Sequence, residues 1–218
     1  MPISLGVGTQ VAIATGYDAA DIFSAITNAS PAVMTLSSGH GLVNADFVEV
    51  NSNWDLLNGR IARITGSATT AASLEGIDTS STTLYPAGGG VGNVRRITGW
   101  TPIPLLADPT LNGGEQQFVD VPELAKQRTG KLPGEVSAID LSMPVYYEAL
   151  PSAGVARVIA VQAAGLPVAI RITHPSGDVI VANGYWSIRR FPSISRTAAR
   201  LSQITFSQLA VDETIYAT

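Results

Sequence analysis

The sequence of 218 residues contains no cysteine and only two histidines. Without cysteine the chain can form neither a disulfide nor a thiolate site, and it does not depend on an oxidising compartment for stability. His40 and His174 are too few for a zinc site of the usual composition. The chain also lacks the Gly-x-Ser-x-Gly sequence that places a nucleophilic serine on a strained turn. We therefore expect no metal site, no cofactor, no catalytic residue and no enzyme.

Charge is also scarce, because charged residues make up 14% of the chain and the net charge is −4. An average globular domain has about 25% charged residues. Nucleic-acid binding by charge neutralisation needs a basic face, so we do not expect it here. A neutral surface rich in small residues favours contact with other protein, because less desolvation is required. The same composition also fits an ordinary β protein with a neutral surface.

The chain has no long apolar run either. No stretch has the length and hydrophobicity needed to cross a bilayer. Residues 1–16 contain no Lys or Arg, so they do not have the form of a secretory signal peptide. We expect a soluble protein that is made and used, or assembled, in the cytoplasm, with no membrane partner.

Two further stretches resemble ligand-binding motifs only in part. Residues 88–92 (GGGVG) are rich in glycine, but they lack the Lys-Ser/Thr pair of a phosphate-binding loop and no helix is expected after them. We predict a hairpin loop there. Four acidic residues do not have the alternating spacing of a calcium loop: Asp46, Glu49, Asp55 and Asp78.

The most regular pattern lies in residues 168–211. Apolar and polar residues alternate before and after a turn at 174–178, and they alternate again from residue 201. Proline early and glycine late in the 174–178 segment are typical of a turn. These patterns predict a hairpin followed by a long third strand. They form a scaffold and contain no recognisable catalytic machinery.

One helix is predicted at residues 152–165, directly before this scaffold. Ser152 is a suitable N-cap, and Gly165 followed by Pro167 ends the helix. Arg157 is expected to point away from the sheet. Four apolar residues share one face at helical spacing: Val155, Val158, Ile159 and Leu166.

An earlier segment, residues 25–98, has a different texture. Short apolar runs are separated at close intervals by glycine, asparagine, aspartate and serine, which favours a small, strongly bent barrel. Asn58-Gly59 predicts a tight hairpin turn, and residues 18–26 are predicted as a brief helical turn. Five strands are expected, at residues 32–36, 47–50, 59–64, 72–75 and 91–97. We predict two domains: a core of residues 1–24 and 99–218, and an inserted module of residues 25–98.

The middle of the chain is less regular. Residues 98–112 contain three prolines and are predicted as an extended connector, while residues 115–121 and 136–145 are predicted as strands. Between these strands lies the most charged loop, residues 123–134. A basic cluster follows later, and it is either a solvated or locally paired strand rim or a set of intersubunit ion pairs. Its residues are Arg189, Arg190, Arg196 and Arg200.

Several short strings resemble the major tail tube protein of long-tailed (siphovirus-type) bacteriophages. Two of them, at residues 2–16 (PISLGVGTQVAIATG) and 113–118 (GGEQQF), lie outside the predicted module. Within it, a small β module that recurs in phage tail and fibre proteins is similar to residues 35–42 (TLSSGHGL), 46–50 (DFVEV) and 57–60 (LNGR). The resemblance implies a mainly β fold, a sandwich or barrel with one flanking α-helix, plus an inserted small β-barrel.

The resemblance also implies a function. The subunit would form hexameric rings that stack into a hollow tube in the virion tail, assembled in the host cytoplasm. DNA would pass through without specific binding, and other partners would be the tape measure, baseplate and terminator proteins. The charged loop would contact the next ring through Lys126, Arg128 and Lys131.

Two other functions stay open from the sequence alone. The chain could be a fibre, baseplate or decoration protein whose small module binds a host surface glycan. Trp54, Tyr85 and Trp100 would then be available to stack on sugar rings. The third possibility is a small hydrolase that uses His174, which the scarcity of catalytic residue types disfavours.

Overall fold

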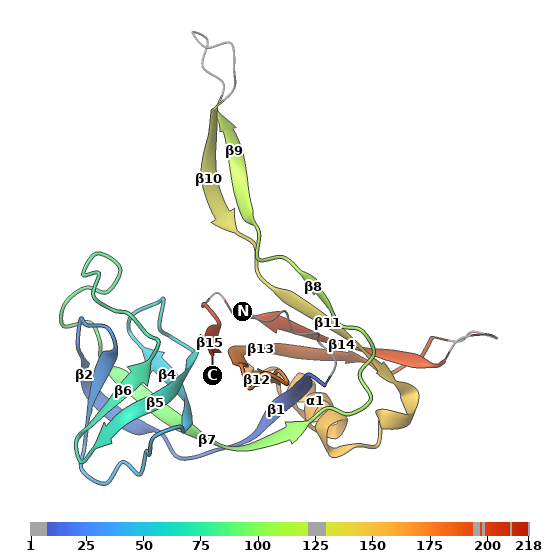
Figure 1. Cartoon of the computed structure of the whole chain (residues 1–218), viewed down its shortest axis with the longest axis horizontal. Helices are drawn as coiled ribbons and strands as arrows, with labels where there is room; N and C mark the ends of the chain where they lie inside the picture. The colour runs from blue at the N-terminus through green and yellow to red at the C-terminus, as the bar shows by residue number, and fades with distance from the viewer. Residues whose placement is uncertain (1–7, 122–129, 194–196, 198, 210, 218) are drawn as a thin grey trace.

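The computed structural model describes residues 8–121, 130–193, 197, 199–209 and 211–217. This part of the chain is mainly β, with 52% of residues in strands, and it contains one α-helix. Figure 1 shows a barrel on one side, a larger sheet with the helix beside it, and a long hairpin that projects from the sheet. The predicted fold class, a tail-tube-like β fold with one helix and a small barrel, is confirmed.

Six antiparallel strands close into the barrel. Their order is β2-β3-β6-β5-β4-β7, and β2 pairs with β7 to complete the circle. Phe23, Met34 and Leu57 are among the fully buried side chains of its interior. The strands are β2 (Asp21–Ile26), β3 (Ala32–Leu36), β4 (Phe47–Ser52), β5 (Arg60–Ala68), β6 (Ala71–Glu75) and β7 (Gly92–Pro102).

The core sheet continues from β7 in the order β1-β12-β13-β14-β11-β8, and a short last strand, β15, pairs with the first part of β13. Its own hydrophobic cluster includes Ile13, Met143 and Ile204. The strands are β1 (Gln10–Tyr17), β8 (Thr110–Asn112), β11 (Asp140–Tyr146), β12 (Val168–Thr173), β13 (Val179–Arg189), β14 (Leu201–Gln208) and β15 (Thr214–Tyr216).

The helix α1 (Ala153–Ala164) begins and ends where the sequence predicts. The Ser152 Oγ accepts a hydrogen bond from the backbone N–H of Val155, and Gly165 adopts φ +65° at the C-cap. A 3-10 turn, η1 (Tyr147–Ala149), precedes it. Two details of the prediction are wrong. Leu166 is largely exposed, and Arg157 turns inward, where its Nε donates to the carbonyl of Ala14 at 3.2 Å.

Strand β7 belongs to both parts of the molecule. Its first half pairs with β4 and β2, and its second half pairs with β1 through Ala14 opposite Trp100 and Ile13 opposite Thr101. The barrel interior has its own hydrophobic cluster, and the cluster of the core sheet is separate from it but also includes Ile61 of β5. The division into a 25–98 module and a surrounding core stays a prediction.

Three local predictions in this region are wrong. Residues 18–26 form no helical turn; they include β2, whose pairing with both β3 and β7 closes the barrel. The connector predicted from residue 98 begins within β7, which runs to Pro102. At Asn58-Gly59, only Gly59 has positive φ, and the Asn58 N–H donates to the carbonyl of Trp54, so a longer turn joins β4 to β5.

Candidate assembly surfaces

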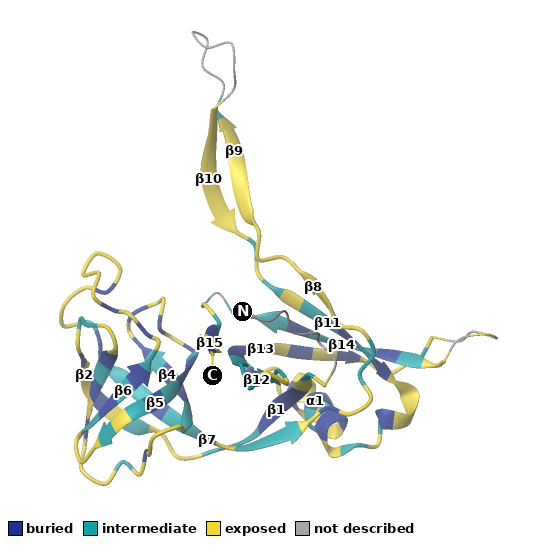
Figure 2. Cartoon of the chain, viewed as in Figure 1, coloured by how far each residue is buried: buried dark blue, intermediate teal, exposed yellow. Residues whose placement is uncertain are grey.

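The projecting hairpin, which we call the arm, consists of β9 (Gln116–Val121) and β10 (Gly130–Val136). Figures 1 and 2 show that it extends away from the body and is exposed along its length. The strand predicted at 115–121 is present as β9. However, the predicted 123–134 loop ends inside β10, and the strand predicted at 136–145 is divided between β10 and β11.

The arm carries large apolar side chains in solvent. Phe118, Val119, Leu132 and Val136 are all more than half exposed. A two-stranded hairpin is marginally stable alone, and an exposed apolar patch is typical of an interaction site. The sequence analysis predicted β9 but missed its pairing with β10, because it assigned residues 130–134 to a loop.

Two consecutive glycines set the direction in which the arm leaves the sheet. Gly113 and Gly114, between β8 and β9, both have positive φ. A Cβ on Gly113 would lie 1.9 Å from the carbonyl oxygen of Ala138. The facing strand is held by a backbone hydrogen bond from Gly114 to Ser137 at 3.0 Å. Gly113 therefore permits a close crossing that no other residue would allow.

Of the three predicted inter-ring residues, the structure places one. Lys131 lies on β10, where its Nζ is 3.8 Å from Asp120 Oδ1 and both side chains are exposed. Lys126 and Arg128 lie outside the described residues. An exposed pair of this kind contributes about 0–1 kcal/mol to stability, so Lys131 remains available to another partner.

The basic cluster is partly brought together at one end of the core sheet. Arg189 ends β13, Arg190 follows it, and Arg200 directly precedes β14, the neighbouring strand. The Arg200 guanidinium is 3.1 Å from the Glu148 carboxylate and stacks over the ring of Tyr147. Arg200 therefore has partners within its own chain. Arg196 lies outside the described residues.

The C-terminal segment fastens the barrel to the core sheet, and the sequence did not predict this. The Tyr216 side chain is 4% exposed, and its Oη accepts a hydrogen bond from the Arg63 N–H at 2.6 Å. The Arg63 guanidinium lies over the tyrosine ring, and Phe47 packs against its edge. Two residues earlier, Thr214 Oγ1 donates to the carbonyl of Ile61 at 2.9 Å. We call Thr214–Tyr216 with these contacts the C-terminal clasp.

A buried charge network forms a second connection. Glu49 on β4 is 4% exposed and is bound by the guanidinium of Arg95 on β7. The Asn183 amide on β13 donates to Glu49 and, at 3.0 Å, to the carbonyl of Gly59. The Arg95 guanidinium also stacks over the ring of Tyr17. The barrel is therefore joined to the core sheet by packing and hydrogen bonds as well as by β7.

Two buried tyrosines at this junction predict instability in alkali. Burial raises the pKa of Tyr17 and of Tyr216 to about 12, from an ordinary value of 10. The unfolded chain therefore releases these protons first as pH rises. The resulting stability is fully present below pH 10, falls between 10 and about 12, and is worth roughly 3 kcal/mol for each tyrosine.

Urea unfolding at about pH 9 and about pH 11 measures the first half of this loss, about 1.4 kcal/mol for each tyrosine, and Tyr17→Phe and Tyr216→Phe should each reduce its size. Tyrosinate absorbance gives an independent measurement. If all six tyrosines of the chain titrated together near pH 10, this prediction would be contradicted.

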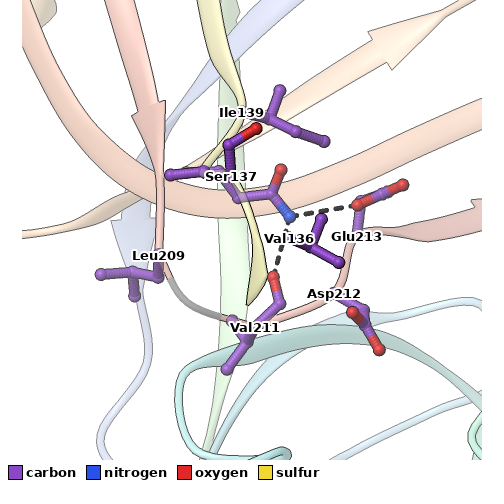
Figure 3. A pocket seen from close by; sticks show the side chains of 9 residues that line it. Val136, Ser137, Ile139, Leu209, Val211, Asp212 and Glu213 are labelled. Atoms are coloured by element: carbon purple, nitrogen blue, oxygen red, sulfur yellow. Dashed lines mark hydrogen bonds between the residues drawn. The ribbon is translucent and has the colours of Figure 1, made fainter. Parts of the chain in front are cut away.

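Two hollows lie beside the base of the arm. One is about 220 Å³ and lies between residues 136–139 and the segment after β14. The Gln208 amide donates to the Val211 carbonyl and to Glu213, and Figure 3 marks these two hydrogen bonds as dashed lines that end at the labelled Val211 and Glu213. The other, which we call the apolar groove, is about 160 Å³. Its walls are mostly apolar and include Leu111, Leu141, Ile172, Ile180 and Ile215.

The residues proposed for sugar stacking are buried or partly buried. Trp54 and Tyr85 are buried in the barrel, where the Trp54 Nε1–H donates to the carbonyl of Pro86. Trp100 is partly buried under the guanidinium of Arg171. The glycine-rich loop contributes to this packing, since a Cβ on Gly90 would lie 2.6 Å from the Trp54 ring. The glycan-binding hypothesis therefore loses the aromatic platform on which it depended.

The two histidines have structural hydrogen bonds. The His40 Nδ1 accepts from the Leu42 N–H, and its Nε2 lies 2.8 Å from the carbonyl of Ala68. His174 Nδ1 lies 3.1 Å from Thr9 Oγ1. Among the residues placed in the structure, no helix is long and apolar enough to span a membrane.

Comparison with known proteins identifies the family. A sequence model described as phage tail tube protein, TTP, matches residues 52–218, more than half of the chain. A search of curated protein sequences finds no match. One similar solved chain comes from a structure described as the tail of an empty GTA particle, with C6 symmetry; it is 15% identical over 56% of this chain and 88% of that chain, with a TM-score of 0.40. On the strength of the match over residues 52–218, the chain belongs to the phage tail tube protein family, a family of structural proteins and not of enzymes.

Proposed function

We propose that this chain is the repeating subunit of a virion tail tube, in which copies form rings, six to a ring, that stack into a hollow tube for DNA. The observation that carries the proposal is the family match over residues 52–218. The tape measure, baseplate and terminator proteins are the other proposed partners. The barrel is the proposed inserted module, placed on the outside of the tube.

The edge of the core sheet supports ring formation. β8 ends the strand order and, within the described part of the chain, pairs only with β11. An unpaired edge is a hazard for a monomer, but it becomes an interface when a second copy covers it. The low charge of the chain reduces the desolvation that such a contact requires. Arg189, Arg190, Arg196 and Arg200 are proposed to contribute ion pairs between subunits of one ring.

The net charge of −4 supports passage of DNA without specific binding. Phosphates are repelled by an acidic surface, whereas Lys- and Arg-rich surfaces retain DNA through released counterions. A tube wall that is poor in basic residues would therefore let DNA slide through.

Electron microscopy of the purified protein tests the proposal. Rings or tubes are the expected result, and the symmetry of end-on views gives the number of subunits. A strict monomer at high concentration that forms no tubes after nucleating tail components are added would refute it.

The charged loop is proposed to join successive rings. Replacing Lys126, Arg128 and Lys131 together by Gln should leave rings intact but shorten the tubes, because contacts between rings lose three cations. The shortening of the tubes should resemble the effect of high salt on the original protein, because salt screens the same charged contacts between rings. Tube length and salt resistance are the measurements, and no change in either would reject the role of these residues.

A further inference from the structure

The arm has two chemically different faces. Side chains alternate along a strand, and directly paired residues share a face. Val119 pairs with Leu132, and Val121 lies on the same side as Val119. This face is aliphatic. The opposite face carries Phe118 and Pro133 together with the Asp120–Lys131 ion pair.

The aliphatic face has no partner within the described structure. Val119 and Leu132 are each 59% exposed. Figure 2 shows exposed residues along both strands of the arm, with no other element packed against them. A hairpin with an uncovered aliphatic face gains stability only when another surface covers it.

The apolar groove is also uncovered within the described structure. Ile170, Ala182 and Phe206 are buried in its floor, while Leu111 and Ile215 remain more than 60% exposed at its edges. Glu213, whose carboxylate is bound by Gln208, is the one acidic residue in its lining. The groove therefore presents aliphatic side chains of the same type as those on the arm. If the aliphatic face of the arm entered the groove, the Asp120–Lys131 ion pair on the opposite face would stay in water.

We infer that the aliphatic face of the arm, formed by Val119, Val121 and Leu132, docks into the apolar groove of a second copy of this chain. The occupant is another copy because the arm projects away from its own body, as Figure 1 shows. The groove also begins at Leu111 and Ile139, next to the base of the arm. A chain whose groove holds the arm of one neighbour therefore has its own arm close by, free to enter the groove of the next neighbour. The same arm-in-groove contact can then be repeated from each copy to the next. The inference rests on the proposed tube assembly and names the surface that receives the arm.

Thiol cross-linking tests the docking, because the chain has no cysteine of its own. Chains with Val119→Cys are mixed with chains with Ile215→Cys under assembly conditions and are treated with a short bis-maleimide. The mixture should yield a covalent dimer at about tenfold the level found with either variant alone. Ile22→Cys, on the barrel and 74% exposed, replaces Ile215→Cys as the matched control and should give no dimer with Val119→Cys.

The outcomes separate the docking from the assembly. Tubes in the microscope without the Val119–Ile215 dimer would overturn the docking and leave the tube proposal standing. Absence of both tubes and dimer would overturn both. A double variant that links within one chain, and so migrates as a monomer, would also overturn docking between copies.

A charge placed on each face of the arm gives a second test that does not depend on cross-linking. Leu132→Asp puts a carboxylate into the docked face and should reduce tube yield by about tenfold or more. Phe118→Asp puts the same charge on the opposite face, at the same 59% exposure, and should reduce tube yield much less than Leu132→Asp does. Equal losses for the two variants would overturn the inference.

Discussion

Replacing Tyr216 by alanine is expected to lower the free energy of unfolding by about 3–5 kcal/mol, although this residue is only two positions from the end of the chain. The ring fills the space between Phe47 and the Arg63 guanidinium, and the hydroxyl binds the backbone of β5. Alanine would remove the packing and leave the junction of barrel and core sheet open. Urea unfolding followed by tryptophan fluorescence measures the loss.

Two further variants resolve the source of this effect. Tyr216→Phe keeps the ring and should cost about 1 kcal/mol, the usual value of one hydrogen bond. Tyr185→Ala, at an aromatic that is 49% exposed, should cost no more than about 0.5 kcal/mol. If Tyr216→Ala were as mild as Tyr185→Ala, the clasp would not be a major source of stability.

Gly113→Ala is expected to abolish tube formation and to leave a folded subunit. The new Cβ would meet the Ala138 carbonyl, so the strands at the base of the arm must separate and the arm must change direction. Positive φ adds a cost of about 1–2 kcal/mol for alanine, which a folded domain tolerates. Circular dichroism and urea unfolding report the fold, and electron microscopy reports the tubes.

Gly39→Ala is the matched control for this variant. Gly39 has φ +85°, close to the +84° of Gly113, but a Cβ there meets nothing within 4 Å. Gly39→Ala should therefore lower the stability of the subunit through the cost of positive φ alone, and tubes should form as in the original protein. Normal tubes from Gly113→Ala would show that the arm direction does not control assembly.

The elements that the sequence predicted well are those defined by local chemistry. Ser152 and Gly165 bound α1 because a cap and a left-handed residue act within one turn of the helix. The turn at 174–178 is closed by hydrogen bonds between His174 and its near neighbours. β12, β13 and β3 follow from simple alternation or from a short apolar run between turns.

The features that sequence reasoning missed depend on partners far along the chain. Asp21–Ile26 is a strand because β7, some 70 residues later, closes the barrel against it. The clasp needs residues 153 positions apart, Arg63 and Tyr216. The arm was missed for a different reason, since its apolar residues lack a buried partner in this chain and so give a pattern that is hard to separate from a loop.

The single strand shared by barrel and core sheet has a mechanical consequence. β7 passes from one to the other without a flexible linker, and its two halves are bonded to different neighbours. A load that pulls the barrel along this strand acts across several backbone hydrogen bonds at once, because antiparallel bonds lie perpendicular to the strands. A pull on the barrel is therefore expected to reach the core sheet through β7, and bending of an assembled tube would be carried by contacts between subunits.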